Sequence, residues 1–198
     1  MRTRWLITTL LVIPLIAPSG HAAPTKVPQV KDAAGDAAGG QSGMDIVSVL
    51  YTTAGTGTGK RYVPKKLIVT MTLGGPVETR PVVNYEAEAK TEFCGDVTLT
   101  YAPGTPYEQT SGFNGWVRWG NCTVGDSTSD LLTATADGKT VRWEFALRAT
   151  PIEVGTMFSN FRARVDPANP VLPLSSSDTA TERGLIDIAA GAGSWKVG

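Results

Sequence analysis

Apolar and polar residues alternate most regularly over residues 140–148. The apolar members share one face of an extended chain: Val141, Trp143, Phe145 and Leu147. A period of two places alternate side chains on opposite faces of a β-strand, so this segment is predicted to be a half-buried strand. The preceding Asp137-Gly138 pair is a strong signal for a tight turn and predicts a hairpin with the stretch 131–136.

The same alternation predicts strands along most of the chain. They fall over residues 45–53, 66–73, 82–92, 96–102, 114–121 and 156–165, with a short last strand from 185–188 and 194–197. The 22 glycines and 13 prolines leave little room for long helices. Eight or nine strands without crossover helices indicate an all-β fold, an antiparallel β-sandwich of jelly-roll type. We expect a single domain over 32–198, entered through an extended lead-in at 24–31.

The first 23 residues have the three parts of a secretory signal peptide. Arg2 and Arg4 form a positive start, residues 5–17 are mostly apolar, and residues 20–23 supply small side chains for cleavage. The apolar run has 13 residues, whereas a membrane-spanning helix needs roughly 20. This segment predicts a secreted, extracellular protein without a membrane span.

Cys94 and Cys122 are the two cysteines of the chain. An exported chain meets an oxidising environment, in which a cysteine pair forms a disulfide. Neither residue belongs to a CxxC motif or stands beside a base that would activate its thiol. We therefore expect one structural disulfide, which contributes about 3 to 4 kcal/mol in the chain-entropy model.

Histidine is almost absent, since His21 is the one copy and lies within the predicted signal. A mature chain without imidazole has no Ser-His-Asp or Cys-His catalysis, no His-ligated zinc and no histidine pH switch. The chain has 18 basic and 18 acidic residues, and 16 against 18 once Arg2 and Arg4 are removed. This near neutrality argues against a nucleic-acid-binding surface. The function classes that remain are catalysis by carboxylates, a metal bound by oxygen ligands, and binding without catalysis.

Three carboxylates gather around a glycine-rich turn just before the first long predicted strand. They are Asp32, Asp36 and Asp45, with Gly35 between the first two. Calcium takes six to eight oxygen ligands, and a flexible glycine-containing turn can direct carbonyl oxygens inward. The same aspartates also suit turns without a metal, because their side chains bond to nearby backbone groups. The spacing alone leaves both interpretations open.

The pattern Asp32-x-x-Gly35-Asp36, followed by Asp45-Ile46, resembles the start of secreted β-sandwich domains related to family-nine carbohydrate-binding modules and DOMON-like domains. In those domains this segment leads into the first strand and commonly holds calcium. The motif covers only the first 20 or so residues of the domain, while a similar order of strands covers most of it. The resemblance implies calcium (Ca2+) as a cofactor and four aspartates as its ligands: Asp32, Asp36, Asp45 and Asp178.

The resemblance also implies binding of a glycan or another cell-wall or cell-surface component. Such domains stack sugar rings on exposed aromatic side chains while polar groups bond the hydroxyls. The candidates lie between the two cysteines: Tyr107, Trp116 and Arg118. Alternation places Trp116 and Arg118 on one strand face and Trp119 on the other, so one tryptophan is expected in the core. Trp116 beside Arg118 is then a ligand platform or a stacked surface pair.

A hydrolase that uses carboxylates alone is the alternative. Glu86, Glu88 and Glu92 fall together on the predicted strand 82–92, whereas a glycosidase needs two acids opposed across a cleft. A solvated strand face is therefore expected at these glutamates.

A group of basic residues flanks the Gly/Thr loop 54–59: Lys60, Arg61, Lys65 and Lys66. It is expected to be the exposed end of a hairpin, with an anionic wall polymer or a lipid surface as an alternative role. Taken together, the sequence favours a secreted, non-catalytic β-sandwich, calcium-stabilised, that binds a glycan. An exported structural or interaction protein without a small ligand is the further alternative.

Overall fold

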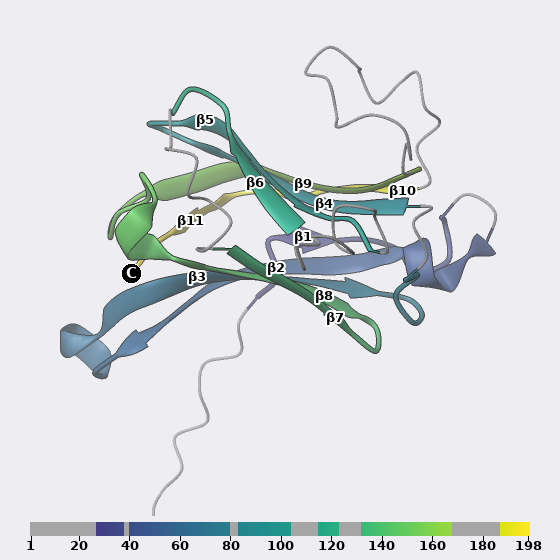
Figure 1. Ribbon diagram of the computed structural model, residues 1–198, viewed down its shortest axis with the longest axis horizontal. Helices are drawn as coiled ribbons and strands as arrows, with labels where there is room; N and C mark the ends of the chain where they lie inside the picture. Colours follow the sequence, from purple (N-terminus) through teal and green to yellow (C-terminus); the bar gives the residue numbers. More distant parts are fainter. Residues whose placement is uncertain (1–26, 38–39, 80–82, 104–114, 123–131, 168–186) are drawn as a thin grey trace, which may run out of the picture.

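A computed structural model of the chain describes residues 27–37, 40–79, 83–103, 115–122, 132–167 and 187–198. These residues form two antiparallel β-sheets that pack face to face (Figure 1). The predicted fold class, an antiparallel β-sandwich with one disulfide, is confirmed. Within the described ranges, no helix is both long enough and apolar enough to cross a membrane.

The first sheet has five described strands in the order β1-β2-β3-β8-β7. Their bounds are Val30–Lys31 for β1, Ile46–Thr56 for β2, Val63–Leu73 for β3, Thr140–Ala146 for β8 and Leu132–Asp137 for β7. The predicted hairpin joins β7 to β8, with Asp137 paired to Thr140. Gly138 has a φ of +54° in this turn, a backbone angle that glycine adopts without a steric penalty.

The second sheet has the described order β10-β9-β4-β5-β6, and β11 also pairs with β9. Its strands are Asp187–Ala190 for β10, Met157–Pro167 for β9, Val83–Thr91 for β4, Gly95–Tyr101 for β5, Gly115–Trp119 for β6 and Ser194–Lys196 for β11. Short 3-10 helices lie in connections between the described strands, at Ser42–Met44 (η2), Gly59–Arg61 (η3) and Leu147–Ala149 (η5).

The core lies between the sheets and is built from the inward faces of both. Tyr51 of the first sheet packs on Phe161 of the second, with ring centroids 4.9 Å apart. Trp143 and Phe145 of β8 are fully buried, as the alternation over 140–148 predicted. Each fully buried large apolar side chain stabilises the fold by roughly 1.5 to 3 kcal/mol relative to exposure, so these aromatic residues hold the sheets together.

The described residues form eleven strands, whereas the sequence predicted eight or nine. The last predicted strand is in fact two strands, β10 and β11, which pair with different parts of β9. The other addition is β1, a two-residue strand in the predicted lead-in that pairs with β2. Two residues are too few to show alternation, so the sequence pattern gives no signal for β1.

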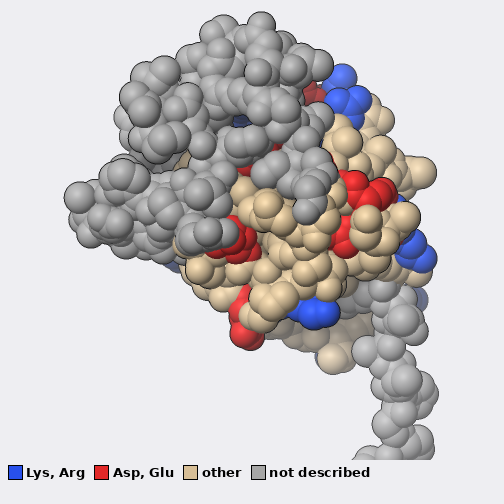
Figure 2. Space-filling view, turned by 90° about the vertical axis from the view of Figure 1, so that its right-hand side faces the viewer, with Lys and Arg blue, Asp and Glu red and all other residues tan. Residues whose placement is uncertain are grey.

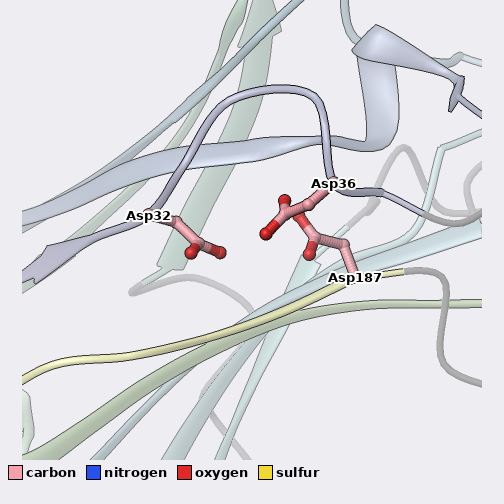
Figure 3. Close-up of side chains that lie close together, drawn as sticks. All are labelled: Asp32, Asp36 and Asp187. Carbon is pink, nitrogen blue, oxygen red and sulfur yellow. The ribbon is translucent and has the colours of Figure 1, made fainter.

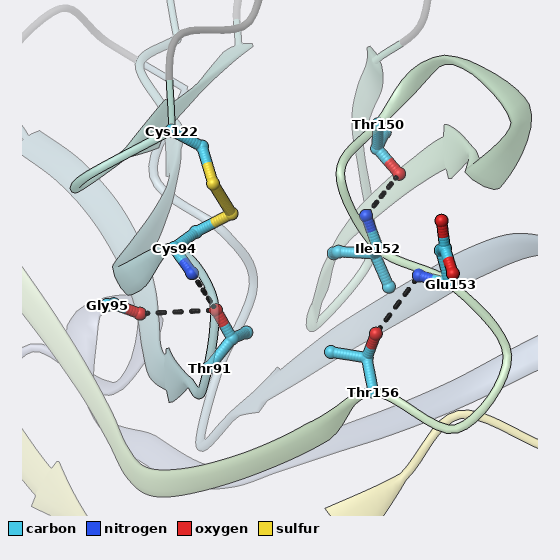
Figure 4. The surroundings of a disulfide bond; sticks show 8 residues. All are labelled: Thr91, Cys94, Gly95, Cys122, Thr150, Ile152, Glu153 and Thr156. Carbon is cyan, nitrogen blue, oxygen red and sulfur yellow. Dashed lines mark hydrogen bonds between the residues drawn. A yellow bond between two sulfur atoms is a disulfide. The ribbon is translucent and has the colours of Figure 1, made fainter.

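The disulfide joins Cys94, in the turn between β4 and β5, to Cys122 just after β6. Hydrogen bonds support the turn around the disulfide: the Cys94 N–H donates to the Thr91 hydroxyl at 3.1 Å (Figure 4). The Asn121 N–H also donates to the Cys94 carbonyl at 2.7 Å. The predicted pairing is confirmed. It fixes the end of edge strand β6 to the neighbouring turn.

Candidate functional site

The segment between β1 and β2 forms a turn that carries two of the predicted metal ligands. Asp32 follows β1 directly, and its N–H donates to the Val47 carbonyl of β2 at 3.0 Å. The chain then turns at Gly35, whose φ of +97° lies in the left-handed region that favours glycine. The turn brings Asp36 back beside Asp32 (Figure 3).

A third carboxylate comes from the second sheet. Asp187 begins β10, and its carboxylate accepts the N–H of Ile46 at 2.5 Å and the N–H of Ile188 at 2.8 Å. Ile46 begins β2, so the first of these hydrogen bonds joins the two sheets. Asp187 is only 7% exposed and shares a strand face with the buried Ala189. It therefore occupies a position where the strand pattern would place an apolar side chain.

Asp32, Asp36 and Asp187 together form what we call the aspartate trio. One carboxylate oxygen from each lies within 4.8 Å of the others, and the side chains point toward one another in Figure 3. Asp32 Oδ2 is buried and has no hydrogen-bond partner, which is a costly position for a charged oxygen. None of the described lysines and arginines forms an ion pair with the trio. An unsatisfied buried oxygen among uncompensated carboxylates fits a bound cation.

The electrostatics of the trio disfavour three free carboxylates. Burial raises the pKa of Asp187 above its ordinary value, and the charges of Asp32 and Asp36 raise it further, against the two backbone donors that lower it. A divalent cation would remove the repulsion and compensate the burial. Because all three donors are carboxylate oxygens, the trio suits a hard cation such as Ca2+ better than a softer metal. Figure 2 views this end of the sandwich and shows acidic side chains at several points on it.

Asp45, the third carboxylate of the predicted motif, lies outside the trio. It is 2% exposed, and its two carboxylate oxygens accept the Gly35 N–H at 2.9 and 2.8 Å. Gly74 approaches it so closely that a Cβ there would lie 2.3 Å from Asp45 Oδ2. Asp45 thus stabilises the turn that carries Asp32 and Asp36, and its role as a ligand stays a prediction. Asp178, the fourth predicted ligand, lies outside the described residues.

Sequence reasoning missed Asp187. The segment 185–190 is otherwise apolar, so a lone acid within a predicted strand is an unusual feature there. That acid falls on the buried face of β10, as its neighbour Ala189 does. The one sequence signal for Asp187 is an acidic residue at an inward position of an otherwise apolar predicted strand.

The outer face of the second sheet holds another group of acids, which is neutralised internally. Arg164 of β9 donates through Nε to Glu86 of β4 at 2.6 Å. The same guanidinium also lies 3.3 Å from Glu88 and 2.9 Å from Asp166. Burial lowers the pKa of Arg164, but the three acids outweigh it and raise that pKa above its ordinary value. We call these four residues the Arg164 cluster.

The prediction of a solvated acidic face is wrong for Glu86. This side chain is 2% exposed and also accepts the hydroxyl of Thr100 at 3.2 Å. Its ion-pair partner Arg164 is 78 residues away in sequence, so strand alternation alone gives no sign of the pairing. Glu92, in contrast, is exposed.

Strand β6 lies at the edge of the same outer face. Trp116 and Arg118 point outward, and Trp116 is 37% exposed. Trp119 is buried and packs edge-on against Phe145, with ring centroids 5.9 Å apart. The structure thus has one tryptophan outside and one in the core, as alternation predicted. The ligand roles stay predictions, and Tyr107 lies outside the described residues.

A row of polar side chains crosses the sheet from β6. Next to Arg118 lies Thr98 of β5, then Glu88 of β4, then Arg162 of β9. Burial raises the pKa of Glu88, although Arg164, Arg162 and Arg118 act to lower it. Arg118 and Arg162 are exposed and form no ion pair with any described residue. The row presents hydrogen-bond donors and acceptors side by side, near the Trp116 ring.

Comparisons of the chain with protein-family models, with curated proteins and with solved structures find no match. The relation to family-nine carbohydrate-binding modules and DOMON-like domains therefore stays a prediction from the motif. The aspartate trio and the outer face of the second sheet are the two candidate sites of the described residues.

Proposed function

We propose that the chain is a secreted, non-catalytic β-sandwich domain whose two sheets are held together by calcium. The observation that supports this is the aspartate trio, with its uncompensated charge and one unsatisfied buried oxygen. Two of its members stand on the β1–β2 turn of the first sheet, and Asp187 stands on β10 of the second. An ion bound among them would cross-link the sandwich.

Asp32, Asp36 and Asp187 would hold the ion, and carbonyl oxygens or water would complete the six to eight ligands that calcium takes. When bound, calcium supplies positive charge to a partly buried acidic site and does not take part in a reaction. An ion that binds only the folded state stabilises it by about 2.7 kcal/mol at 100 times the Kd. Extracellular calcium modules have Kd values of about 10⁻⁴ to 10⁻³ M, which suits a secreted domain.

Thermal unfolding with and without calcium tests this proposal. For a domain of this size, saturating calcium should raise the Tm by roughly 5 to 10 °C relative to protein in EDTA. Magnesium should raise it less, because it demands a smaller octahedral site. Identical melting curves in calcium and in EDTA would reject calcium stabilisation.

A saccharide bound on the outer face of the second sheet is the second candidate function. It is supported by the exposed Trp116 ring next to Arg118, at the end of a row of donors and acceptors. A sugar ring stacks its apolar face on an aromatic plane, while its hydroxyls bond to arginine and glutamate. The carboxylate hydrolase is less well supported, since Glu86 and Glu88 stand on the same strand and share Arg164 rather than facing each other.

Glycan-array binding with matched variants tests the saccharide site. Trp116→Ala should weaken binding by about tenfold or more, since stacking on one aromatic ring is worth up to ~1.5 kcal/mol beyond its buried area. Phe93→Ala removes another exposed aromatic side chain, on the β4–β5 turn, and should leave binding unchanged. Silence of the wild-type protein on the array would reject this function. Turnover of model glycosides that Glu88→Gln abolishes would instead favour the hydrolase.

A further inference from the structure

The β2–β3 hairpin extends beyond the strands that flank it. Strand β8 pairs with β3 only as far as Lys66, and β1 pairs with β2 only as far as Val49. Past these points the register continues between β2 and β3 alone, up to the pair Thr56 and Val63. Figure 1 shows this end of the hairpin, with η3 at its tip, projecting from the body of the sandwich.

The projecting end is strongly basic. Residues 46–73 contain four basic residues and no acidic residue, although the whole chain is neutral. Lys66 is paired with Glu144 of β8 at 3.0 Å. The other three, Lys60, Arg61 and Lys65, are exposed and form no ion pair with a described residue. They give the tip a local charge of about +3 with no compensating acid nearby on the hairpin.

A β-bulge contributes to this arrangement. Ala54 pairs with Lys66, but the next residue, Gly55, pairs with Pro64, so Lys65 is an extra residue on β3. A bulge lets consecutive side chains depart from strict alternation. As a result Lys65 and Lys66 are both exposed.

The backbone of the tip is held by specific contacts. The Arg61 N–H donates to the Thr58 carbonyl, and the Tyr62 N–H donates to the Gly59 carbonyl, both at 3.1 Å. Tyr62 also donates through its hydroxyl to Thr53 at 3.1 Å. Gly57 has a φ of +81°, and a Cβ there would lie 2.2 Å from the Arg61 carbonyl oxygen. Three cations on a preorganised turn lose less conformational entropy on binding than three on a free loop.

We propose that this tip, through Lys60, Arg61 and Lys65, binds an anionic polysaccharide. A linear polyanion can contact a narrow tip through a few charges. Three charges would hold an anionic bilayer only weakly, at about 1 kcal/mol each, and Val63, 46% exposed, is the one large exposed apolar side chain of the hairpin that could insert as well. Nucleic acid would need a broader basic surface than a neutral chain offers. The proposal depends neither on calcium nor on the saccharide site of the second sheet.

Calorimetric titration of the full mature protein with polygalacturonate and with dextran sulfate tests this, with neutral dextran as the uncharged match. Both anionic polymers should bind, and neutral dextran should not. Affinity should fall about tenfold or more between roughly 50 and 300 mM NaCl, because salt screens exposed charges. Binding should persist in EDTA, which separates this contact from the calcium site.

Two triple variants complete the test. K60Q/R61Q/K65Q should weaken binding about tenfold or more, since each lost contact with the polyanion removes one released counterion. K90Q/R148Q/K196Q removes the same charge from exposed positions elsewhere and should change affinity less than about twofold. The substituted side chains are exposed, so both variants should keep the wild-type Tm. Equal losses in the two variants, no binding to either anionic polymer, or binding only to phosphatidylglycerol vesicles would overturn the proposal.

Discussion

The aspartate trio and the Arg164 cluster each bring three carboxylates together, but they differ in how the negative charge is compensated. In the Arg164 cluster one guanidinium lies within ion-pair distance of all three acids. In the trio, no basic side chain of the described residues is paired with any of the three. The trio also has a buried oxygen, Asp32 Oδ2, without a hydrogen-bond partner.

The difference shows how this sandwich tolerates acids in and near its interior. Glu86, which is almost fully buried, is supplied with an arginine and a hydroxyl from its own sheet. Asp187 is similarly buried but is supplied only with backbone N–H groups and two further carboxylates. Since buried charges are normally paired or bound to metal, the trio is the place where we propose that an external cation binds.

The largest expected effect on stability comes from removing the positive charge of Arg164. Arg164→Met should lower the free energy of unfolding by about 3 to 5 kcal/mol, because it leaves a buried carboxylate without its partner. Urea unfolding measures this loss, which should be the same in calcium and in EDTA. Arg162→Met, at an exposed position two residues earlier on β9, should cost less than about 0.5 kcal/mol. A loss below about 1 kcal/mol for Arg164→Met would remove the contrast between the two clusters.

Asp36→Asn tests whether the aspartate trio binds calcium, again through the free energy of unfolding. Asp36 is exposed and accepts no hydrogen bond from a described residue, so the substitution should leave stability in EDTA unchanged or slightly higher, because it also removes repulsion with Asp187. In saturating calcium, the variant should lose most of the roughly 2.7 kcal/mol that the ion supplies. The readout is the calcium-minus-EDTA difference in unfolding free energy. An equal difference in wild type and variant would show that Asp36 is not a ligand.

Asp45→Asn distinguishes a role of Asp45 in stabilising the turn from a role as a calcium ligand. The substitution leaves one oxygen in place of the two that accept the Gly35 N–H, at a buried position, and should cost about 1 to 2 kcal/mol with or without calcium. The calcium increment measured by the same unfolding experiment should be largely retained. If the increment disappears, Asp45 is a ligand, as the sequence motif predicted.

The smallest expected effect has the opposite sign and concerns Glu88. Its folded-state pKa is raised by burial, so the stability it contributes is present at acid pH and is lost as pH rises through that pKa. The loss begins near the ordinary value of about 4.3 and ends above it. At neutral pH, Glu88→Gln should therefore be as stable as wild type or slightly more stable, by less than about 1 kcal/mol. A pH series of urea unfolding curves checks this, and a variant clearly less stable at pH 7 would contradict it.

Most of the fold could be predicted from the sequence because alternation is a local signal. It located β8 and the β7–β8 hairpin within a residue or two, and it placed Trp116 and Trp119 on opposite faces of β6. It missed β1, which is too short to alternate, and the early start of β3 at Val63, which follows from pairing across the hairpin tip. Both depend on contacts between strands rather than on the pattern of one strand.

The candidate site was less predictable for the same reason. Asp32 and Asp36 were found together because a single turn carries them. The third member, Asp187, reaches them only because β10 lies beside β1 when the sheets pack, with Val30 bridged to Gly191. The pairing of Glu86 with Arg164 likewise joins strands far apart in sequence. Spacing along the chain identifies residues that share one turn. Which distant acidic or basic residues lie beside that turn depends on the sheet topology.

Crystals of the protein grown with calcium provide the most direct test of the proposed calcium site. We expect an anomalous difference peak with one oxygen from each of Asp32, Asp36 and Asp187 at about 2.3 to 2.6 Å, the range of calcium–oxygen distances in proteins. A well-ordered trio without such a peak, or calcium bound only elsewhere on the chain, would contradict it.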